Sequence, residues 1–172
     1  MRSPCRTSAI LLLLASSLTA CGSAEERAPA SPTVAVDTAA VRAGVDDLWA
    51  KWAAADTAED LDAILALATE DVRLDIRGVP PMVRRDSART VMRPMYAQLD
   101  YLEASASPRS TVAITNALAH QTGTYRERYT MKGERGERTD HGRYAAALVK
   151  GDDGQWRWAY MMAMVDSTTT KP

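Results

Sequence analysis

The last third of the chain contains the pattern that most constrains the fold: two long apolar segments separated by a short polar turn. The segments span residues 141–150 and 155–165, and Gly151-Asp-Asp-Gly154 lies between them. Because Gly and Asp readily adopt turn conformations, the pattern predicts an antiparallel β-hairpin. In a regular second strand, side chains alternate between faces. One face would then carry the large side chains Trp156, Trp158, Tyr160, Met162 and Met164.

A short turn would place small residues of the first strand opposite these large side chains. We expect Val149 to pair with Trp156, Ala147 with Trp158, and Ala145 with Tyr160. Each ring buried in this way would contribute about 2–3 kcal/mol through its apolar area. The hairpin is therefore predicted to form either the core of the domain or the wall of a pocket.

Composition excludes several classes of site. The charge is nearly balanced, with 21 basic and 22 acidic residues, which argues against a nucleic-acid partner. Both cysteines, Cys5 and Cys21, lie near the N-terminus, so no disulfide, thiolate metal site or catalytic cysteine is expected in the folded part. The two histidines are distant in sequence, and no phosphate-binding glycine-rich loop is present. We therefore expect no metal and no cofactor.

The N-terminus has the features of a bacterial lipoprotein signal. Arg2 and Arg6 precede an apolar run over residues 9–18, which is too short to span a bilayer as a mature helix. The sequence Leu18-Thr-Ala-Cys21 then resembles a lipobox, so residues 1–20 are predicted to be cleaved and Cys21 to be lipidated. A secretory signal with a chance cysteine is the alternative. The lipobox predicts a location in the cell envelope, and Gly22 favours the outer membrane, facing the periplasm, if the cell has two membranes.

The sequence after the signal peptide predicts one α+β domain over residues 38–166. A flexible linker at 21–37 precedes this domain, and a disordered tail at 167–172 follows it. Asp37 is expected to cap a first helix, and Thr57 with Asp60 a second one. Pro94 is expected to kink the third helix. The later part reads as an antiparallel β-meander, and the helices would cover one side of the sheet. The first and third helices are expected to span about 38–55 and 88–104. The shorter second helix has its apolar stripe between Leu61 and Ala68 and is expected to end at Glu70-Asp71, before a first strand at 72–76.

Several local patterns occur in an informative order. They are Trp49 and Trp52, Thr69-Glu-Asp71, the segment 119–125, and, within the final hairpin, Gly142-Arg-Tyr144 followed by Lys150-Gly-Asp-Asp-Gly154-Gln-Trp156. Together they resemble the nuclear transport factor 2-like superfamily, in particular its SnoaL-like and ketosteroid-isomerase-like domains. The resemblance covers about residues 38–166. It implies a cone-shaped, curved antiparallel sheet packed against about three N-terminal helices, with a cavity at the wide end and a possible homodimer through the sheet.

The resemblance does not specify an activity, because this fold hosts both enzymes and binding modules. Large side chains are candidates for the wall of a ligand cavity. Each of them fits plain core packing equally well. The candidate pocket residues are Trp49, Trp52, Tyr96, Tyr125, Trp158, Tyr160 and Met162.

Two residues are candidates for a catalytic base, Asp75 and His141. Asp75 alternates with apolar strand residues, so it either faces water or lies at the mouth of the cone. His141 begins the final hairpin beside Asp140 and is either a surface residue or a proton-transfer group. The charge-dense segment 126–138 is interpreted as a solvated hairpin tip.

Three functions follow from these patterns. The first is a lipid-anchored extracytoplasmic domain that binds a small, mainly apolar molecule in a cone-shaped cavity. The second is an isomerase or hydrolyase of a hydrophobic carbonyl compound that uses a carboxylate or histidine base. The third is a non-catalytic subunit that binds another protein through its sheet. Side chains that enter the cavity would distinguish the first two.

Overall fold

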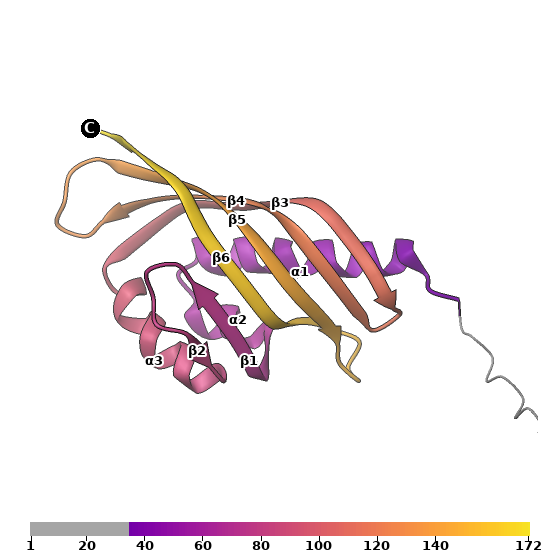
Figure 1. Cartoon of the computed structure of the whole chain (residues 1–172). Coiled ribbons are helices and arrows are strands. Elements are labelled where there is room, and N and C mark those ends of the chain that lie inside the picture. Colours follow the sequence, from indigo (N-terminus) through magenta and orange to yellow (C-terminus); the bar gives the residue numbers. More distant parts are fainter. Residues whose placement is uncertain (1–34) are drawn as a thin grey trace, which may run out of the picture. The chain divides into compact units, whose positions relative to one another are not determined.

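The computed structural model describes residues 35–172 of the chain (Figure 1). The predicted signal peptide, the lipidated Cys21 and most of the predicted linker lie outside these described residues. The three helices of the described part are α1 (Thr38–Thr57), α2 (Leu61–Ala66) and α3 (Arg85–Tyr96). Its six strands are β1 (Ala68–Ile76), β2 (Met82–Val83), β3 (Leu99–Thr115), β4 (Leu118–Met131), β5 (Glu137–Lys150) and β6 (Trp156–Lys171).

The first two helices begin where local sequence signals place them. The carboxylate of Asp37 accepts a hydrogen bond from the backbone N–H of Ala40 at 2.9 Å, and Asp60 accepts one from Ala63 at 2.9 Å. Each bond satisfies a donor that has no partner within the helix. Asp60, rather than Thr57, is therefore the N-cap of α2. The apolar stripe of α1 is buried, at Val41, Val45, Leu48, Trp49 and Trp52.

The third helix is shorter than predicted. It ends at Tyr96, two residues after Pro94, and β3 begins at Leu99. Proline lacks the backbone donor that a helix interior requires, so the helix does not continue far beyond it. The prediction of helix through residue 104 was therefore wrong. The segment 99–104 instead belongs to the 17-residue β3, which pairs with β4.

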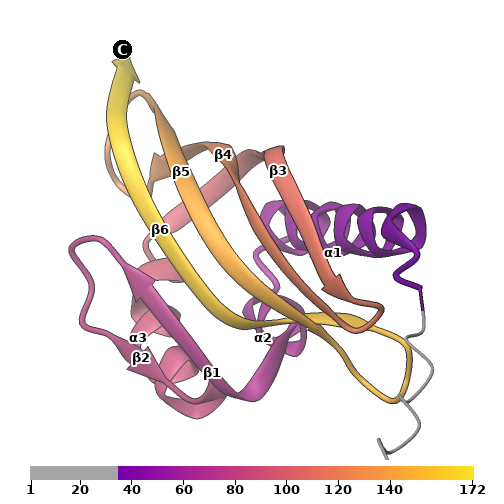
Figure 2. The ribbon, with the colours of Figure 1, turned by 45° about the vertical axis from the view of Figure 1, so that its right-hand side comes forward.

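The strands form one curved sheet in the order β2-β1-β6-β5-β4-β3. All neighbours are antiparallel except β1 and β6, which run parallel, so the sheet is mixed rather than purely antiparallel. Figures 1 and 2 show all three helices on one side of this sheet. We call the side that faces the helices the inner face, and the opposite side the outer face. The curved sheet and the helical layer confirm the predicted α+β architecture.

A β-bulge in β6 changes the predicted face of the last strand. Lys150 pairs with Trp156 and Leu148 with Trp158, but Ala147 pairs with Tyr160, so Ala159 is an extra residue. An extra residue reverses which side chains face inward. Beyond the bulge, Met161, Ala163 and Val165 lie on the inner face, whereas Tyr160, Met162 and Met164 lie on the outer face. The predicted single face of large side chains therefore exists only at Trp156 and Trp158.

Strand β6 also extends beyond the predicted end of the domain. Residues 167–171 pair with β5, and the last pair joins Lys171 to Glu137. Three consecutive threonines lie here, and their β-branched side chains favour extended structure. The segment expected to be a disordered tail is thus strand almost to its end.

The core fills the space between the helices and the inner face. Its fully buried large side chains include Leu48, Leu65, Met82, Leu148 and Trp158. Among residues 35–172, no helix combines the length and the apolar character needed to cross a bilayer.

Candidate functional site

The apolar interior contains a partly open cavity of about 260 Å³ between the helices and the inner face of the sheet. Most of its wall is aliphatic or aromatic, and it receives side chains from all three helices and from every strand. Its aromatic lining consists of Trp49, Trp52, Tyr96, Tyr101, Tyr125, Tyr129, Tyr144 and Trp158. A volume of this size would hold the equivalent of about nine water molecules, which suits a small ligand.

One end of the cavity is closed by a satisfied polar network around Gln121. This side chain is fully buried. Its Oε1 accepts hydrogen bonds from the indole N–H of Trp49 and from the hydroxyl of Tyr144, the latter at 2.9 Å. Its Nε2 donates to the hydroxyl of Thr111 at 2.8 Å. The network fixes the Trp49 and Tyr144 rings, whose centroids are 4.3 Å apart, and thereby shapes the wall.

Tyrosine rings form the wall at the other end of the cavity. Tyr96 and Tyr101 have ring centroids 5.1 Å apart, and Tyr101 and Tyr129 lie 6.0 Å apart. Tyr125 lines the same region from β4. Burial raises the pKa of Tyr96, Tyr101 and Tyr125 above the ordinary value, and nearby carboxylates raise these pKa values further. These phenols therefore stay neutral and keep their hydroxyl protons.

Glu127 is the most perturbed carboxyl group on the cavity wall. It lies on the inner face of β4 between Tyr125 and Tyr129. Burial, followed by the charges of Asp56 and Asp140, raises its pKa from 4.5 to about 8. Its flanking residues Arg126 and Arg128 lie on the outer face, where both pair with Glu103. Among the described residues, Glu127 has no side-chain hydrogen bond and no ion pair.

Two further carboxyl groups lie near Glu127. Asp56, at the end of α1, is fully buried and accepts a 2.5 Å hydrogen bond from the Tyr96 hydroxyl. Burial raises the pKa of Asp56 to about 6, although the Tyr96 hydrogen bond lowers it. Its second oxygen has no partner within residues 35–172. Asp140 lines the cavity and accepts hydrogen bonds from Tyr129 at 3.3 Å and Thr168 at 2.6 Å.

The structure brings together five of the seven candidate pocket residues on the wall of the cavity: Trp49, Trp52, Tyr96, Tyr125 and Trp158. Tyr160 and Met162 do not line it, because the bulge at Ala159 turns them to the outer face. The prediction that these two residues line the pocket was therefore wrong.

The two candidate bases also lie on the outer face. Asp75 forms a 2.9 Å ion pair with Arg73, and the hydrogen bond from Arg73 lowers the pKa of Asp75. His141 pairs with Ser167 across the outer face and borders a separate depression with Arg126 and Asp166. Neither position allows contact with a molecule held inside the cavity.

Sequence reasoning missed Glu127, Asp140, Asp56 and Tyr101. The segment 126–138 was interpreted as solvated, yet its first residues belong to the cavity wall. A signal was present, since Tyr125, Glu127 and Tyr129 alternate with Arg126 and Arg128. Alternation with period two separates the two faces of a strand. It would have placed the glutamate and the tyrosines together.

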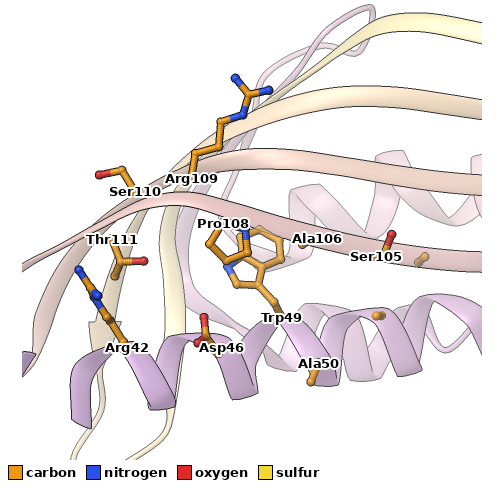
Figure 3. Close-up of a pocket in the computed structure, with 12 residues that line it drawn as sticks. Arg42, Asp46, Trp49, Ala50, Ser105, Ala106, Pro108, Arg109, Ser110 and Thr111 are labelled. Atoms are coloured by element: carbon orange, nitrogen blue, oxygen red, sulfur yellow. The ribbon is translucent and has the colours of Figure 1, made fainter. Parts of the chain in front are cut away.

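A second hollow lies between α1 and β3, as an open groove of about 740 Å³ (Figure 3). Trp49 rises from α1 toward β3 and lines both the groove and the cavity (Figure 3). Figure 3 also shows Arg109 pointing away from α1. The groove is wider and more open to solvent, so it confines a ligand less than the cavity does. Within residues 35–172, no cluster of three or more His, Cys, Asp or Glu side chains is arranged to hold a metal ion.

Comparisons with known proteins give matches in structure but not in sequence. Neither a family model nor a curated protein matches the sequence. A ketosteroid isomerase-like protein from Erwinia carotovora atroseptica superposes with a TM-score of 0.65 at 18% identity, over 73% of this chain and 95% of that one. A putative scytalone dehydratase from Novosphingobium aromaticivorans gives a TM-score of 0.66 at 15% identity, over 77% and 88%.

An NTF-2-like protein of unknown function from Shewanella oneidensis is also similar, with a TM-score of 0.59 at 16% identity. That alignment covers 72% of this chain and 98% of the other. Likenesses at such low identity establish architecture, whereas function depends on the residues of the site. The order of the helices, the curved sheet and these superpositions agree that the chain has the nuclear transport factor 2-like fold.

Proposed function

We propose that this chain binds a small, mainly apolar molecule in the cavity between its helices and the inner face of its sheet. The observation that supports the proposal is an aromatic-lined cavity that the surrounding core side chains do not fill. Protein interiors are otherwise close-packed, so an open space of this size is costly unless it has a use. Aromatic walls with a few polar groups are typical of small-molecule sites.

The similar structures are consistent with this proposal. Two of them are named for a ketosteroid isomerase-like protein and a scytalone dehydratase, and both names refer to reactions of small organic molecules. The present chain shares the architecture of those proteins, and architecture alone does not identify a ligand. The ligand therefore has to be sought from the residues that line the cavity.

Cavity filling tests the proposal. Ala163 lines the cavity, and the Ala163→Leu change would add side-chain volume inside it. Ala145 pairs with Met162 on the outer face of the neighbouring strand, so Ala145→Leu is the matched control. Binding of benzyl alcohol, followed by saturation-transfer NMR on the full chain, should be lost in Ala163→Leu and kept in Ala145→Leu. A wild-type protein that binds no small aromatic probe would refute the proposal, as would equal binding by both variants.

A second candidate function is acid–base catalysis, and the position of Glu127 favours it. A carboxyl group with a pKa near 8 exchanges protons efficiently around neutral pH. In this candidate, Glu127 removes a proton next to a carbonyl group, and a neutral tyrosine hydroxyl donates a hydrogen bond to the carbonyl oxygen. It replaces Asp75 and His141 in the role of base, because those residues lie on the other face.

Hydrogen–deuterium exchange would test this activity. The protein should accelerate exchange of the methyl protons of acetophenone, with a rate that rises up to about pH 8 and then levels off. Glu127→Gln should abolish the acceleration. If the variant retains it, Glu127 is not the base.

We also propose that lipidated Cys21 anchors the domain in the cell envelope. The proposal rests on the charged start, the apolar run and the small residues before the cysteine. Cys21→Ser should release the protein from membranes or leave an uncleaved precursor. A mutant that still behaves as a mature, detergent-requiring lipoprotein would contradict the anchor.

A further inference from the structure

Most of the charged side chains around the cavity are acidic. Glu127 and Asp140 are on its wall, and Asp56 lies behind Tyr96. Arg77 is the one basic residue of the lining among the described residues, and it is exposed and donates to the carbonyl of Val165 at 3.4 Å. The titratable or charged groups on or directly behind the wall are Asp56 on α1, Arg77 after β1, Tyr96 on α3, Tyr101 on β3, Tyr125, Glu127 and Tyr129 on β4, and Asp140 and Tyr144 on β5.

The nearest other cations are already paired elsewhere. Arg126 and Arg128 lie on the outer face with Glu103, and Arg138 pairs with Glu134 at 2.5 Å. Strand alternation prevents Arg126 and Arg128 from turning to Glu127 without reversing the register of β4. Within residues 35–172, no ion pair joins a basic side chain to Glu127, Asp56 or Asp140, although Arg138 lies close enough to Tyr129 to offset part of the rise in pKa that burial causes there. Buried charges are normally paired, so these carboxyl groups can pair with a positively charged group of a ligand.

The tyrosine wall also favours a cation. The Tyr96, Tyr101 and Tyr129 rings follow one another at 5.1 and 6.0 Å, and their faces attract positive charge. Because their hydroxyls stay neutral, they do not compete with the carboxyl groups. A ligand with a negative charge would be repelled by Asp140, and also by Glu127 when that group is ionised at about pH 8 and above.

The opposite end of the cavity has a different chemistry. There the Trp49, Tyr144 and Trp158 rings are packed together, and the polar atoms of Gln121 are bonded to protein. This end is mostly apolar and provides no free acceptor, because Gln121 Oε1 already receives two hydrogen bonds. The indole N–H of Trp158 at this end is a buried donor without a partner among the described residues. A molecule that fits both ends has a charged head and an apolar body.

We infer that the ligand of this cavity is a small organic cation, a protonated amine whose ammonium group lies between Glu127 and the tyrosine rings. Its apolar body extends toward Trp49 and Trp158. This inference rests on the proposed binding function and specifies the class of its ligand. It applies equally to a ligand that is only bound and to a substrate that is turned over.

Binding of a cation would be coupled to a proton. A protonated Glu127 must release its proton to pair with the ammonium group, so affinity should rise by about tenfold per pH unit below pH 8. An alkyl ammonium group stays protonated over this range. A neutral ligand of the same shape would show no such rise.

Three probes with the same ring separate charge from shape: benzylamine, benzyl alcohol and benzoate. NMR titrations of the full chain at pH 6, 7 and 8 should give the order amine, alcohol, benzoate at pH 8. We expect the amine to bind about tenfold more tightly than the alcohol, or better. Glu127→Gln should remove this preference and leave the alcohol unchanged. Glu103→Gln, a matched change on the outer face, should leave all three affinities unchanged.

The outcomes separate the two proposals. If benzyl alcohol binds as tightly as benzylamine to the wild type, the cation inference is wrong while the binding function stands. The cation inference is also wrong if Glu127→Gln, shown to be folded by circular dichroism, keeps the full preference for the amine. If none of the three probes binds, the binding function itself fails and the inference fails with it.

Discussion

The polar side chains at the two ends of the cavity differ in whether they form hydrogen bonds with the protein. Gln121 and Glu127 lie on the same face of β4, six residues apart in sequence. Gln121 exchanges hydrogen bonds with Trp49, Tyr144 and Thr111. Glu127 makes no side-chain hydrogen bond within the described residues and has like charges as neighbours.

The difference indicates which group serves the fold and which serves a ligand. A satisfied neutral amide holds surrounding rings in place and contributes to stability. A carboxyl group without a partner costs stability, and such a cost is typical of functional sites. Mutations at the two ends should therefore have opposite effects on the free energy of unfolding.

Removing the amide at the closed end should have the largest effect. Gln121→Leu would leave the Trp49 N–H and two hydroxyls without their partner, at a cost of about 3–4 kcal/mol. Urea unfolding followed by tryptophan fluorescence would measure the loss. Gln155→Leu is a control on the surface, where the amide accepts from Lys51, and should change stability by about 0.5 kcal/mol or less. A loss below about 1 kcal/mol in Gln121→Leu would show that the network is not structural.

At the tyrosine-lined end of the cavity, Glu127→Gln should stabilise the protein. Because the pKa of Glu127 rises from 4.5 unfolded to about 8 folded, its ionised form opposes folding. Below about pH 4.5 the wild type and the variant should be equally stable. As the pH rises to about 8, the wild type should become less stable than the variant. The variant should gain about 3 kcal/mol at pH 7. Urea midpoints measured from pH 4 to pH 8 would test this.

Glu103→Gln on the outer face is the control for that series. Hydrogen bonds from Arg126 lower the pKa of Glu103, so its ionised form favours folding. The control should lose stability slightly at neutral pH, the reverse of Glu127→Gln. Equal pH profiles for the two variants would contradict the assigned difference between the faces.

A smaller effect is expected at the bond between Tyr96 and Asp56. Tyr96→Phe removes the hydroxyl that donates at 2.5 Å, and should cost about 1–2 kcal/mol at neutral pH. It should also raise the pKa of Asp56 above its present value of about 6, because the hydrogen bond lowers it. Carbon-detected NMR of the Asp56 carboxyl group would report the change. An unchanged pKa would mean that the bond is not formed in solution.

The smallest effects should distinguish the two faces beyond the bulge. Met161 lines the cavity and Met162 is 36% exposed on the outer face. Met161→Ala should cost about 1–2 kcal/mol and change the affinity for benzyl alcohol. Met162→Ala should cost about 0.5 kcal/mol or less and leave that affinity unchanged. If Met162→Ala has the larger effect on stability and affinity, the bulge does not lie at Ala159.

Local signals in the sequence determined much of the architecture. Asp37 begins α1, Gly151 to Gly154 separates the last two strands, and the apolar stripe of α1 is buried. Each of these features depends on residues a few positions apart, so the local sequence is enough to predict it. The resemblance added the curved sheet and the cavity, and five of the seven large side chains proposed for the wall do line it.

Tertiary structure decided the rest, because it depends on strands that are distant in sequence. Which way Tyr160 and Met162 point follows from the bulge opposite β5, and the parallel pairing of β6 follows from β1. The isolation of Glu127 has the same origin. Its raised pKa results first from burial and then from the charges of Asp56 on α1 and Asp140 on β5, and no local sequence pattern brings these residues together.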